Sequence, residues 1–480
     1  MSPVETAAEG GVTAGRREAR SPWRAFGVLA IGVFLAVLDL FIVNIAFPDI
    51  QRSFSSASLS SLSWILSAYA IVFAAVLVPA GKLADIVGRK RVFLAGLLIF
   101  LTGSALCAAA PSVDFLIGAR LIQAVGGAAL IPTSLGLILP LFPAAKRATV
   151  IGLWAAIAGV GAAAGPPIGG LLVEASWRWI FLINLPLGLF ALIRSAQIIP
   201  EIRDPERGRF PDLLGSLLLI IAIGTLTLGL VKGPDWSWDG RSLGAFAAAA
   251  VLLVLFTLRS ARHPAPVVEL PLLRPPAFAL SALSTLLFFA AFAVLLLANV
   301  LFLTDVWQYS VIKAGLAFFP GPLIAAIVAA LSGRLGGRYG SARVGAPGGF
   351  IFALASLWFL TSLGDQPHYL SEYLPGQLLG GIGVGLMLPA FTALAASTLP
   401  PTRLATGIGV QTAFRQIGAA LGLASFVAIV GSSTLASKSD FDGAWLFMAI
   451  AAAGAGITLT PLLRHRPHAA VEARAPVTSA

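Results

Sequence analysis

The chain has 480 residues, of which 58% are hydrophobic and only 11% carry a charge. A soluble domain has about a quarter of its residues charged, and its surface needs polar cover, so this composition excludes a water-soluble globule. The formal net charge is +11, but the basic residues stand in small groups beside apolar runs, and no nucleic-acid partner is expected.

Apolar runs of about 18–25 residues without strand-like alternation predict membrane-spanning helices and an all-α fold. The first 24 residues contain no apolar stretch, so no cleavable signal peptide is expected. Fourteen spans are predicted at residues 26–47, 61–80, 92–110, 115–139, 149–172, 179–199, 213–231, 243–259, 277–303, 314–332, 344–363, 375–398, 405–430 and 443–463.

The Lys and Arg residues predict the orientation of these spans. With a cytoplasmic N-terminus, 24 of the 32 basic residues fall in cytoplasmic segments and six in external ones. The remaining two, Arg120 and Arg415, lie inside spans. Because cytoplasmic loops carry the excess of basic residues, we expect a multi-pass protein of the plasma or inner membrane with both termini in the cytoplasm.

Two pairs of similar segments within the chain predict a duplicated architecture. Residues 81–91 share a glycine-punctuated, basic pattern with residues 333–343, and residues 126–132 resemble residues 383–389. Spans 1–6 and 9–14 are therefore expected to form two pseudo-symmetric six-helix bundles around a central cavity, with spans 7 and 8 inserted between them. The predicted divisions are a tail at 1–24, a bundle at 25–199, a linker with two inserted helices at 200–262, a bundle at 263–465 and a tail at 466–480.

Asp39 is the sharpest feature, because it lies deep in the first span. A carboxylate there costs a few kcal/mol and should face a partner or a wet cavity. It could take up and release a proton as its surroundings change. A structural ion pair that never releases its proton is the alternative.

Arg120 in the fourth span is the natural partner of Asp39. At ~1.5 Å per residue, Arg120 lies about 9 Å and Asp39 about 12 Å from the outer end of its helix, so a contact is allowed. Breaking the pair would let Asp39 bind a proton, whereas a permanent pair would only latch two helices together. Gln123 lies one turn further in and faces the same way.

The segment between spans 2 and 3 is expected to be a short loop that stabilises one conformation of a switch. Gly81 and Gly88 let two helices turn closely, and Asp85 could cap a helix or pair with a neighbouring arginine such as Arg89. Plain positive-inside topology would explain the basic residues but not Asp85 and its glycines. The second copy has Gly337 in place of the acid, so any such latch exists on one side only.

The fifth span carries Gly161, Gly165, Gly169 and Gly170, with Pro166 among them. Small residues at every fourth position permit close approach of two backbones, and proline removes a helix donor. These residues predict a bent, tightly packed helix suited to sealing or hinging.

Further polar residues at membrane depth are candidates to line a cavity. Arg415 and Gln416 lie in the thirteenth span, where cavity contact and structural pairing remain equally open. Asn44 and Gln123 are the corresponding candidates in the first half. Asp305, near the outer end of the ninth span, is expected to be a solvated interfacial acid.

Enzymatic functions find little support. No phosphate-binding Walker loop is present, the single cysteine is Cys107, and the histidines do not cluster as metal ligands. No catalytic residue, metal or cofactor is expected, which leaves an ion gradient, preferably of protons, as the energy source. The four histidines outside the spans are His263, His368, His465 and His468.

Residues 25–465 resemble the fourteen-span drug:proton antiporters of the major facilitator superfamily. Residues 38–48 are similar to the signature L-D-x-T-I-V-N-x-A-L-P, with Phe41 in place of Thr and Phe47 in place of Leu. Three further stretches resemble the cytoplasmic gating motif (81–91), the proton-relay motif with Ala124 in place of Gly (120–129) and the antiporter motif (161–170).

The resemblance implies that Asp39 and Arg120 take part in proton coupling, that Asp85 takes part in gating, and that transport is export. The hypothesis is proton-coupled efflux of amphipathic organic compounds, often cationic or neutral, by one chain acting as a monomer. An uptake symporter of the same fold and a non-transporting scaffold or sensor are the alternatives. No residue indicates which compounds are carried or what spans 7 and 8 do.

Overall fold

The computed structural model describes residues 22–203, 210–398, 404–430 and 437–464. Within these ranges fourteen helices are long and apolar enough to cross a membrane, which confirms the fourteen predicted spans. Most of both predicted tails and part of the linker after the sixth span lie outside the described residues, and the proposed division at 25–199, 200–262 and 263–465 stays a prediction.

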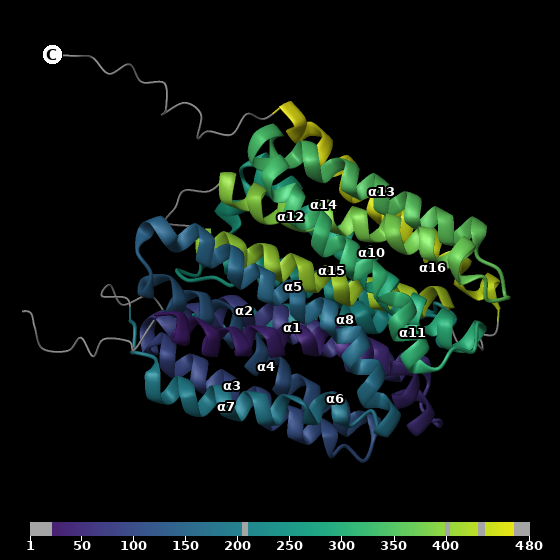
Figure 1. Ribbon diagram of the computed structural model, residues 1–480, viewed down its shortest axis with the longest axis horizontal. Helices are drawn as coiled ribbons and strands as arrows, with labels where there is room; N and C mark the ends of the chain where they lie inside the picture. Colours follow the sequence, from purple (N-terminus) through teal and green to yellow (C-terminus); the bar gives the residue numbers. More distant parts are fainter. Residues whose placement is uncertain (1–21, 204–209, 399–403, 431–436, 465–480) are drawn as a thin grey trace, which may run out of the picture.

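The first six spans are followed by the inserted pair (Figure 1). The sixth span consists of two consecutive helices, α6 and α7. The helices are α1 (Pro22–Ser53), α2 (Leu59–Val87), α3 (Arg89–Ala108), α4 (Val113–Ile138), α5 (Ala144–Ala175), α6 (Trp179–Leu182), α7 (Asn184–Ile198), α8 (Leu213–Lys232) and α9 (Gly240–Arg262).

The last six spans follow the same plan, with the tenth span formed by two consecutive helices, α11 and α12. A short π-helical segment, η3 (Phe302–Val306), extends the ninth span. The helices are α10 (Pro276–Leu301), α11 (Val311–Phe318), α12 (Pro320–Tyr339), α13 (Ser341–Ser362), α14 (Leu374–Thr398), α15 (Leu404–Val430) and α16 (Asp442–Leu459).

Helix α2 continues well past the apolar run that predicted it, and this corrects the expected loop after the second span. Residues 81–87 are helical, and only Gly88 separates α2 from α3. Its φ of +122° is a backbone conformation that suits glycine. Charged side chains interrupted the apolar run but not the helix, because a helix that emerges from the membrane no longer needs apolar residues. Helix α12 likewise continues to Tyr339 and ends at Gly340, with φ +97°.

The two halves repeat the same helix contacts. In the first half α1 packs on α5, α2 on α4, and α3 on α7; in the second half α10 packs on α15, α12 on α14, and α13 on α16. Between the halves α2 contacts α15, and α5 contacts α11 and α12. The first half lies below the second in Figure 1. The chain therefore forms two pseudo-symmetric bundles, as expected.

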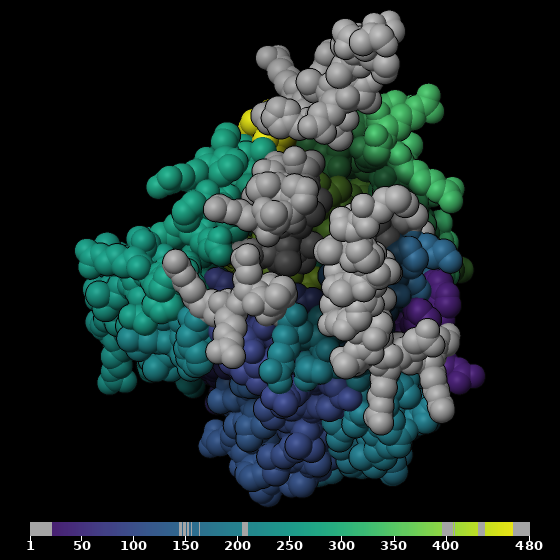
Figure 2. All heavy atoms as spheres, turned by 90° about the vertical axis from the view of Figure 1, so that its left-hand side faces the viewer, coloured from purple at the N-terminus to yellow at the C-terminus, as the bar shows by residue number. Residues whose placement is uncertain are grey.

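The described chain begins at Pro22 and ends at Arg464 on one face of the molecule, the left-hand side of Figure 1, which we call the terminal face. Figure 2 views this face, with the blue first half below and the green second half above. The far ends of the same helices form the opposite face.

The inserted helices α8 and α9 lie outside this central region. They pack on each other, and α8 also reaches α2 and α15. Arg259 Nε at the end of α9 lies 2.7 Å from Asp212 Oδ1, which caps the start of α8. The teal residues of this part project from one side of the body in Figure 2. The inserted pair therefore packs on the outside of the α2–α15 contact through α8.

Glycines set the closeness of the contact between α10 and α15. A Cβ on Gly418 would overlap the backbone carbonyl oxygen of Leu286, and a Cβ on Gly422 would overlap that of Ala290. The two backbones therefore touch along a seam that excludes even a methyl group. Small residues at such positions are a general means by which membrane helices pack.

We expect Gly422→Ala to destabilise the folded protein by about 1–3 kcal/mol, because overpacking forces backbone shifts. The measurement is thermal unfolding of the purified protein in detergent, followed by tryptophan fluorescence. Gly224→Ala in α8 is the matched control, since a Cβ there meets no atom within 4 Å. Equal midpoints for the two variants would contradict the seam.

Candidate functional site: a buried charge network and its gates

Asp39 of α1 and Arg120 of α4 form an ion pair in the interior of the first half. Arg120 Nη1 donates a hydrogen bond of 2.5 Å to Asp39 Oδ2. The two side chains are 0% and 1% exposed. The contact predicted from their matching depths is therefore present. Because both side chains are buried, each charge satisfies the other, which offsets part of the cost of burying both.

Gln123 joins the same pair, as its position one turn from Arg120 suggested. Its Nε2 donates to Asp39 Oδ1 at 2.9 Å, and its Oε1 accepts from Arg120 Nη1 at 2.6 Å. Both carboxylate oxygens of Asp39 are therefore engaged, one by a charged donor and one by an amide. The site is a three-residue unit and not a simple pair.

Ser104 and Asn184 extend the network, and the sequence analysis missed both. Ser104 Oγ accepts from Gln123 Nε2 at 2.7 Å and from Asn184 Nδ2 at 2.9 Å. Ser104 belongs to α3 and Asn184 to α7, so four helices of the first half meet here. The available signal was the presence of single polar residues within apolar runs, but it does not say which of them meet.

Tyr69 of α2 covers the other side of the arginine. The Arg120 guanidinium carbon lies 3.9 Å from the centroid of the Tyr69 ring, a cation–π arrangement, and Arg120 Nε donates to the backbone oxygen of Ile65 at 3.3 Å. The lone cysteine is close by, with Cys107 Sγ 3.7 Å from Gln123 Oε1. Arg120 is thus held from three sides.

The predicted gating residues meet on the terminal face. Arg89 Nε donates to Asp85 Oδ1 at 2.9 Å, and Arg89 Nη1 donates to the backbone oxygen of Gly136 at the same distance. Asp85 therefore pairs with an arginine and does not cap a helix. This pair fastens the turn between α2 and α3 to the end of α4. The role of Gly136 was not apparent from the sequence.

Two glycines of the gating segment are confined by their neighbours. A Cβ on Gly88 would lie 2.5 Å from Glu201 Oε1, the oxygen that accepts from the backbone nitrogen of Lys90 at 3.0 Å. A Cβ on Gly81 would lie 3.3 Å from that of Pro132. The chain after the sixth span therefore closes over this turn. In the second half Gly337 takes the place of Asp85 and leaves no corresponding acid.

The glycines of the fifth span, which predicted a tightly packed helix, face α1. A Cβ on Gly161 would lie 3.1 Å from the backbone oxygen of Phe34, and one on Gly165 would lie 2.7 Å from Phe41 Cβ. Gly169 meets Ile42 in the same way. Helix α5 is continuous through its prolines, from Ala144 to Ala175. The motif thus brings α5 against the helix that carries Asp39.

The same segment also contacts the second half. A Cβ on Gly170 would lie 3.2 Å from the Cα of Ile312 in α11, and one on Gly315 would lie 2.9 Å from the backbone oxygen of Pro166. These contacts are backbone to backbone, so no solvent-filled gap separates the halves at this level. The motif joins both α1 and α11 to α5 toward the opposite face.

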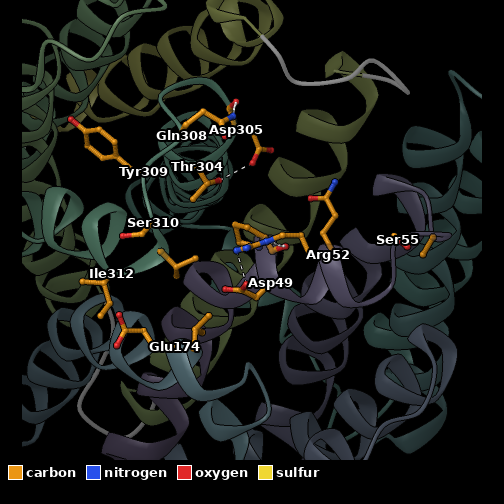
Figure 3. A pocket seen from close by; sticks show the side chains of 15 residues that line it. Asp49, Arg52, Ser55, Glu174, Thr304, Asp305, Gln308, Tyr309, Ser310 and Ile312 are labelled. Atoms are coloured by element: carbon orange, nitrogen blue, oxygen red, sulfur yellow. Dashed lines mark hydrogen bonds and ion pairs between the residues drawn. The ribbon is translucent and has the colours of Figure 1, made fainter.

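A cavity of about 910 Å³ opens on the opposite face between the two halves (Figure 3). Asp305 lies at its rim and accepts from the hydroxyl of Thr304 at 2.9 Å. Arg52 pairs with Asp49 across 2.5 Å. The wall is formed by Pro48, Asp49, Gln51, Arg52, Ser55, Ala57, Val173, Glu174, Thr304, Asp305, Gln308, Tyr309, Ser310, Val311 and Ile312.

The remaining predicted cavity residues differ from one another. Asn44 Nδ2 donates to Leu40 O of its own helix at 2.8 Å, so its amide is satisfied locally. Arg415 has no ion pair or hydrogen bond with any residue that the structure describes, and its guanidinium carbon lies 5.5 Å from the Phe289 ring centroid. Gln416 is 4% exposed, and its Nε2 has no partner in the described part of the chain.

Two related helix bundles with a charge network inside one of them define a polytopic membrane transporter. The sequence profile described as Major Facilitator Superfamily matches residues 29–423, with a second match at residues 281–479. The chain belongs to this superfamily. The expected membership is therefore confirmed.

Named relatives agree with this membership. The chain is 38% identical over 399 residues to the multidrug resistance protein Stp of Mycobacterium tuberculosis, covering 82% of this chain and 73% of that protein. It is 33% identical over 475 residues to the probable actinorhodin transporter of Streptomyces coelicolor, covering 95% and 81%. The fold is similar to a crystal structure of a POT family transporter, with a TM-score of 0.66 at 15% identity over 92% of this chain and 97% of that one.

We expect Arg89→Ala to destabilise the described conformation by about 1–3 kcal/mol, because it removes two hydrogen bonds that the charged guanidinium donates. Arg91→Ala is the matched control, since Arg91 is 65% exposed and lies 3.8 Å from its nearest carboxylate. Thermal unfolding of both purified variants measures the difference. A midpoint for Arg89→Ala as high as that of Arg91→Ala would show that the turn is not fastened by this residue.

Proposed function

We propose that the protein is a proton-coupled antiporter that exports amphipathic organic compounds, antibiotics among them, across the cell membrane. The buried contact of Asp39 with Arg120 carries this proposal. The export direction and the class of cargo are supported by the relatives described above, one a multidrug resistance protein and one a probable transporter of an antibiotic. The proton gradient is the energy source, and no cofactor is needed.

Coupling follows from the chemistry of the network. While Arg120 and Gln123 both donate to Asp39, the ionised carboxylate is stabilised, and binding a proton is unfavourable. A displacement of α1 relative to α4 removes those donors. An ionised carboxylate without donors in an apolar interior is far more costly than a neutral one, so Asp39 then takes up a proton. Return of Arg120 expels it.

The proposed cycle alternates access between the two faces. The distribution of basic residues supports a cytoplasmic position for the terminal face. The contacts of Gly170 and Gly315 close the other side. Cargo enters from the cytoplasm, and proton uptake from outside drives its release there. Opening toward the outside requires the α5–α11 contact to separate. At the same time the two halves approach each other on the terminal face, near the α2–α3 turn that carries Arg89.

One chain is sufficient for this cycle, because it contains both bundles, the charge network and the contacts between the halves. We therefore propose a monomeric functional unit whose partners are protons, the lipid bilayer and a small organic cargo. The contact between α2 and α15 and the contact between α5 and α11 are places where the halves move against each other.

We expect Asp39→Asn to abolish cargo flux driven by a pH gradient, because the amide cannot bind and release the transported proton. Purified protein in liposomes, loaded with a fluorescent dye that the wild-type protein transports, measures the flux. Asp114→Asn is the control, since Asp114 lies exposed in the first turn of the helix that carries Arg120. It should transport within about twofold of the wild-type rate.

The same vesicles separate the competing functions. An antiporter moves cargo against the direction of the proton, whereas an uptake symporter moves both the same way. Wild-type rates in the Asp39→Asn variant would overturn the proposed coupling. An absence of gradient-dependent flux for every dye and antibiotic tested with the wild-type protein would favour a scaffold or sensor.

A further inference from the structure

Arg415 is placed where a membrane protein can least tolerate a free charge. It lies in the middle of α15, 11 residues after Leu404 and 15 before Val430. At 1.5 Å per residue this is about 16 Å from the helix start. A charged side chain at this depth is costly unless something compensates it, and such residues are rare outside functional sites.

No protein group described by the structure compensates this charge. The helices that pack against α15 are α2, α8, α10, α14 and α16. Their only carboxylates are Asp85 in the last turn of α2 and Asp442 at the start of α16, far from the middle of the membrane. Asp85 and Asp442 are each engaged by a cation, Arg89 and Lys438 respectively. Asp39, which lies at mid-membrane depth among the described residues, is already paired with Arg120.

One aromatic ring lies next to the guanidinium, and further rings extend from it. Phe289 of α10 lies beneath it at 5.5 Å, and the Phe289 centroid lies 5.8 Å from that of Phe292. Phe292 in turn lies 6.1 Å from Phe41 of α1, and Phe289 lies 6.4 Å from Phe391 of α14. These four rings, which we call the phenylalanine platform, join the first half to the second. Phe41 stands where similar antiporters commonly have threonine.

The platform cannot neutralise the arginine on its own. A ring stabilises a cation through its quadrupole by about 0.5–2 kcal/mol, less than an ion pair in the same surroundings supplies. A guanidinium also has five N–H donors and never loses its proton in a protein. Arg415 therefore cannot carry the transported proton, and its unused donors call for an acceptor that the described residues do not provide.

Gln416 adds a second donor without a partner. Its side chain is 4% exposed, and its Nε2 finds no acceptor among the described residues. Arg415 is partly exposed, whereas Gln416 is buried, and successive residues of a helix do not face the same way. The acceptor that arrives with the cargo is therefore assigned to Arg415 alone, and the unpaired Gln416 amide, a buried donor of a kind that is usually satisfied, is not part of the cargo site.

We propose that Arg415 and the phenylalanine platform form the cargo site, and that the cargo is an organic anion, with a carboxylate or acidic phenol on an aromatic body. The anionic group pairs with Arg415 through charge-assisted hydrogen bonds, and the aromatic body stacks on Phe289 and Phe292. The inference rests on the proposed export function and narrows its cargo. It differs from the hypothesis drawn from the sequence, in which the cargo is often cationic or neutral.

The test measures binding of two related dyes to the purified full-length protein in nanodiscs of phosphatidylcholine. Fluorescein at pH 8 carries a carboxylate and an acidic phenol, whereas rhodamine 6G has a similar ring system, an esterified carboxyl and a positive charge. Fluorescence anisotropy gives both affinities. We expect the wild-type protein to bind fluorescein more tightly than rhodamine 6G.

Substitutions of Arg415 separate charge from packing. Arg415→Gln should weaken fluorescein binding by about tenfold or more, the loss of a charge-assisted contact, and change rhodamine 6G binding by less than about twofold. Arg415→Lys should retain an intermediate affinity for fluorescein. Phe289→Ala should weaken both dyes. Arg241→Gln is the control, since Arg241 is 73% exposed on α9, and it should change neither.

A wild-type protein that binds fluorescein no more tightly than rhodamine 6G, or not at all, would overturn the proposal. Equal losses for both dyes in Arg415→Gln would reduce Arg415 to a structural role. Size-exclusion chromatography checks folding, and should Arg415→Gln fail it, the Lys and Phe289→Ala variants decide. Because binding is measured without a gradient, this result is independent of the flux assay with Asp39→Asn, and either proposal can fail alone.

Discussion

The cost of an unsatisfied charge inside an apolar protein governs this molecule. Asp39 and Arg120 are essentially inaccessible to solvent, and neither is tolerable without the other. The helices of the first half are arranged so that Gln123, Ser104 and Tyr69 complete the contact. The same cost makes the network responsive. In the proposed mechanism, a displacement of α1 relative to α4 that preserves the fold makes the protonated carboxylate the more stable state, and this couples the helix movement to a proton.

The two halves share their helix packing but not their charges. The first half closes its charges within itself, and the acid of the gating turn pairs with Arg89. The second half carries Gly337 in place of that acid and leaves Arg415 without a partner among the described residues. In the proposed mechanism, ion coupling lies in the first bundle, and the cation that binds the cargo lies in the second. The phenylalanine platform, which includes Phe41 next to the Asp39 segment, is a contact between the two bundles.

Sequence alone was sufficient for the spans and the central pair. Fourteen apolar runs have no other stable state in a membrane, and the depths of Asp39 and Arg120 follow from a fixed rise per residue. The prediction of where α2 ends was wrong, because Lys82 and Asp85 interrupt an apolar run without interrupting the helix. Ser104 and Asn184 could not be assigned, since each is one polar residue among many and their meeting depends on helix rotation. That Arg415 lacks a partner is likewise visible only in three dimensions.

The single cysteine gives the network an intrinsic reporter. Cys107 is buried and lies beside Gln123 Oε1, so its thiol belongs to the same polar cluster as the ion pair. A thiol in an enclosed site reacts slowly with alkylating reagents, whereas one exposed by helix separation reacts at its ordinary rate. Since the chain has no second thiol, every modified molecule reports on this one place. The alkylation rate of Cys107 in the native protein therefore measures how often the buried ion pair becomes accessible, and no engineered label is needed.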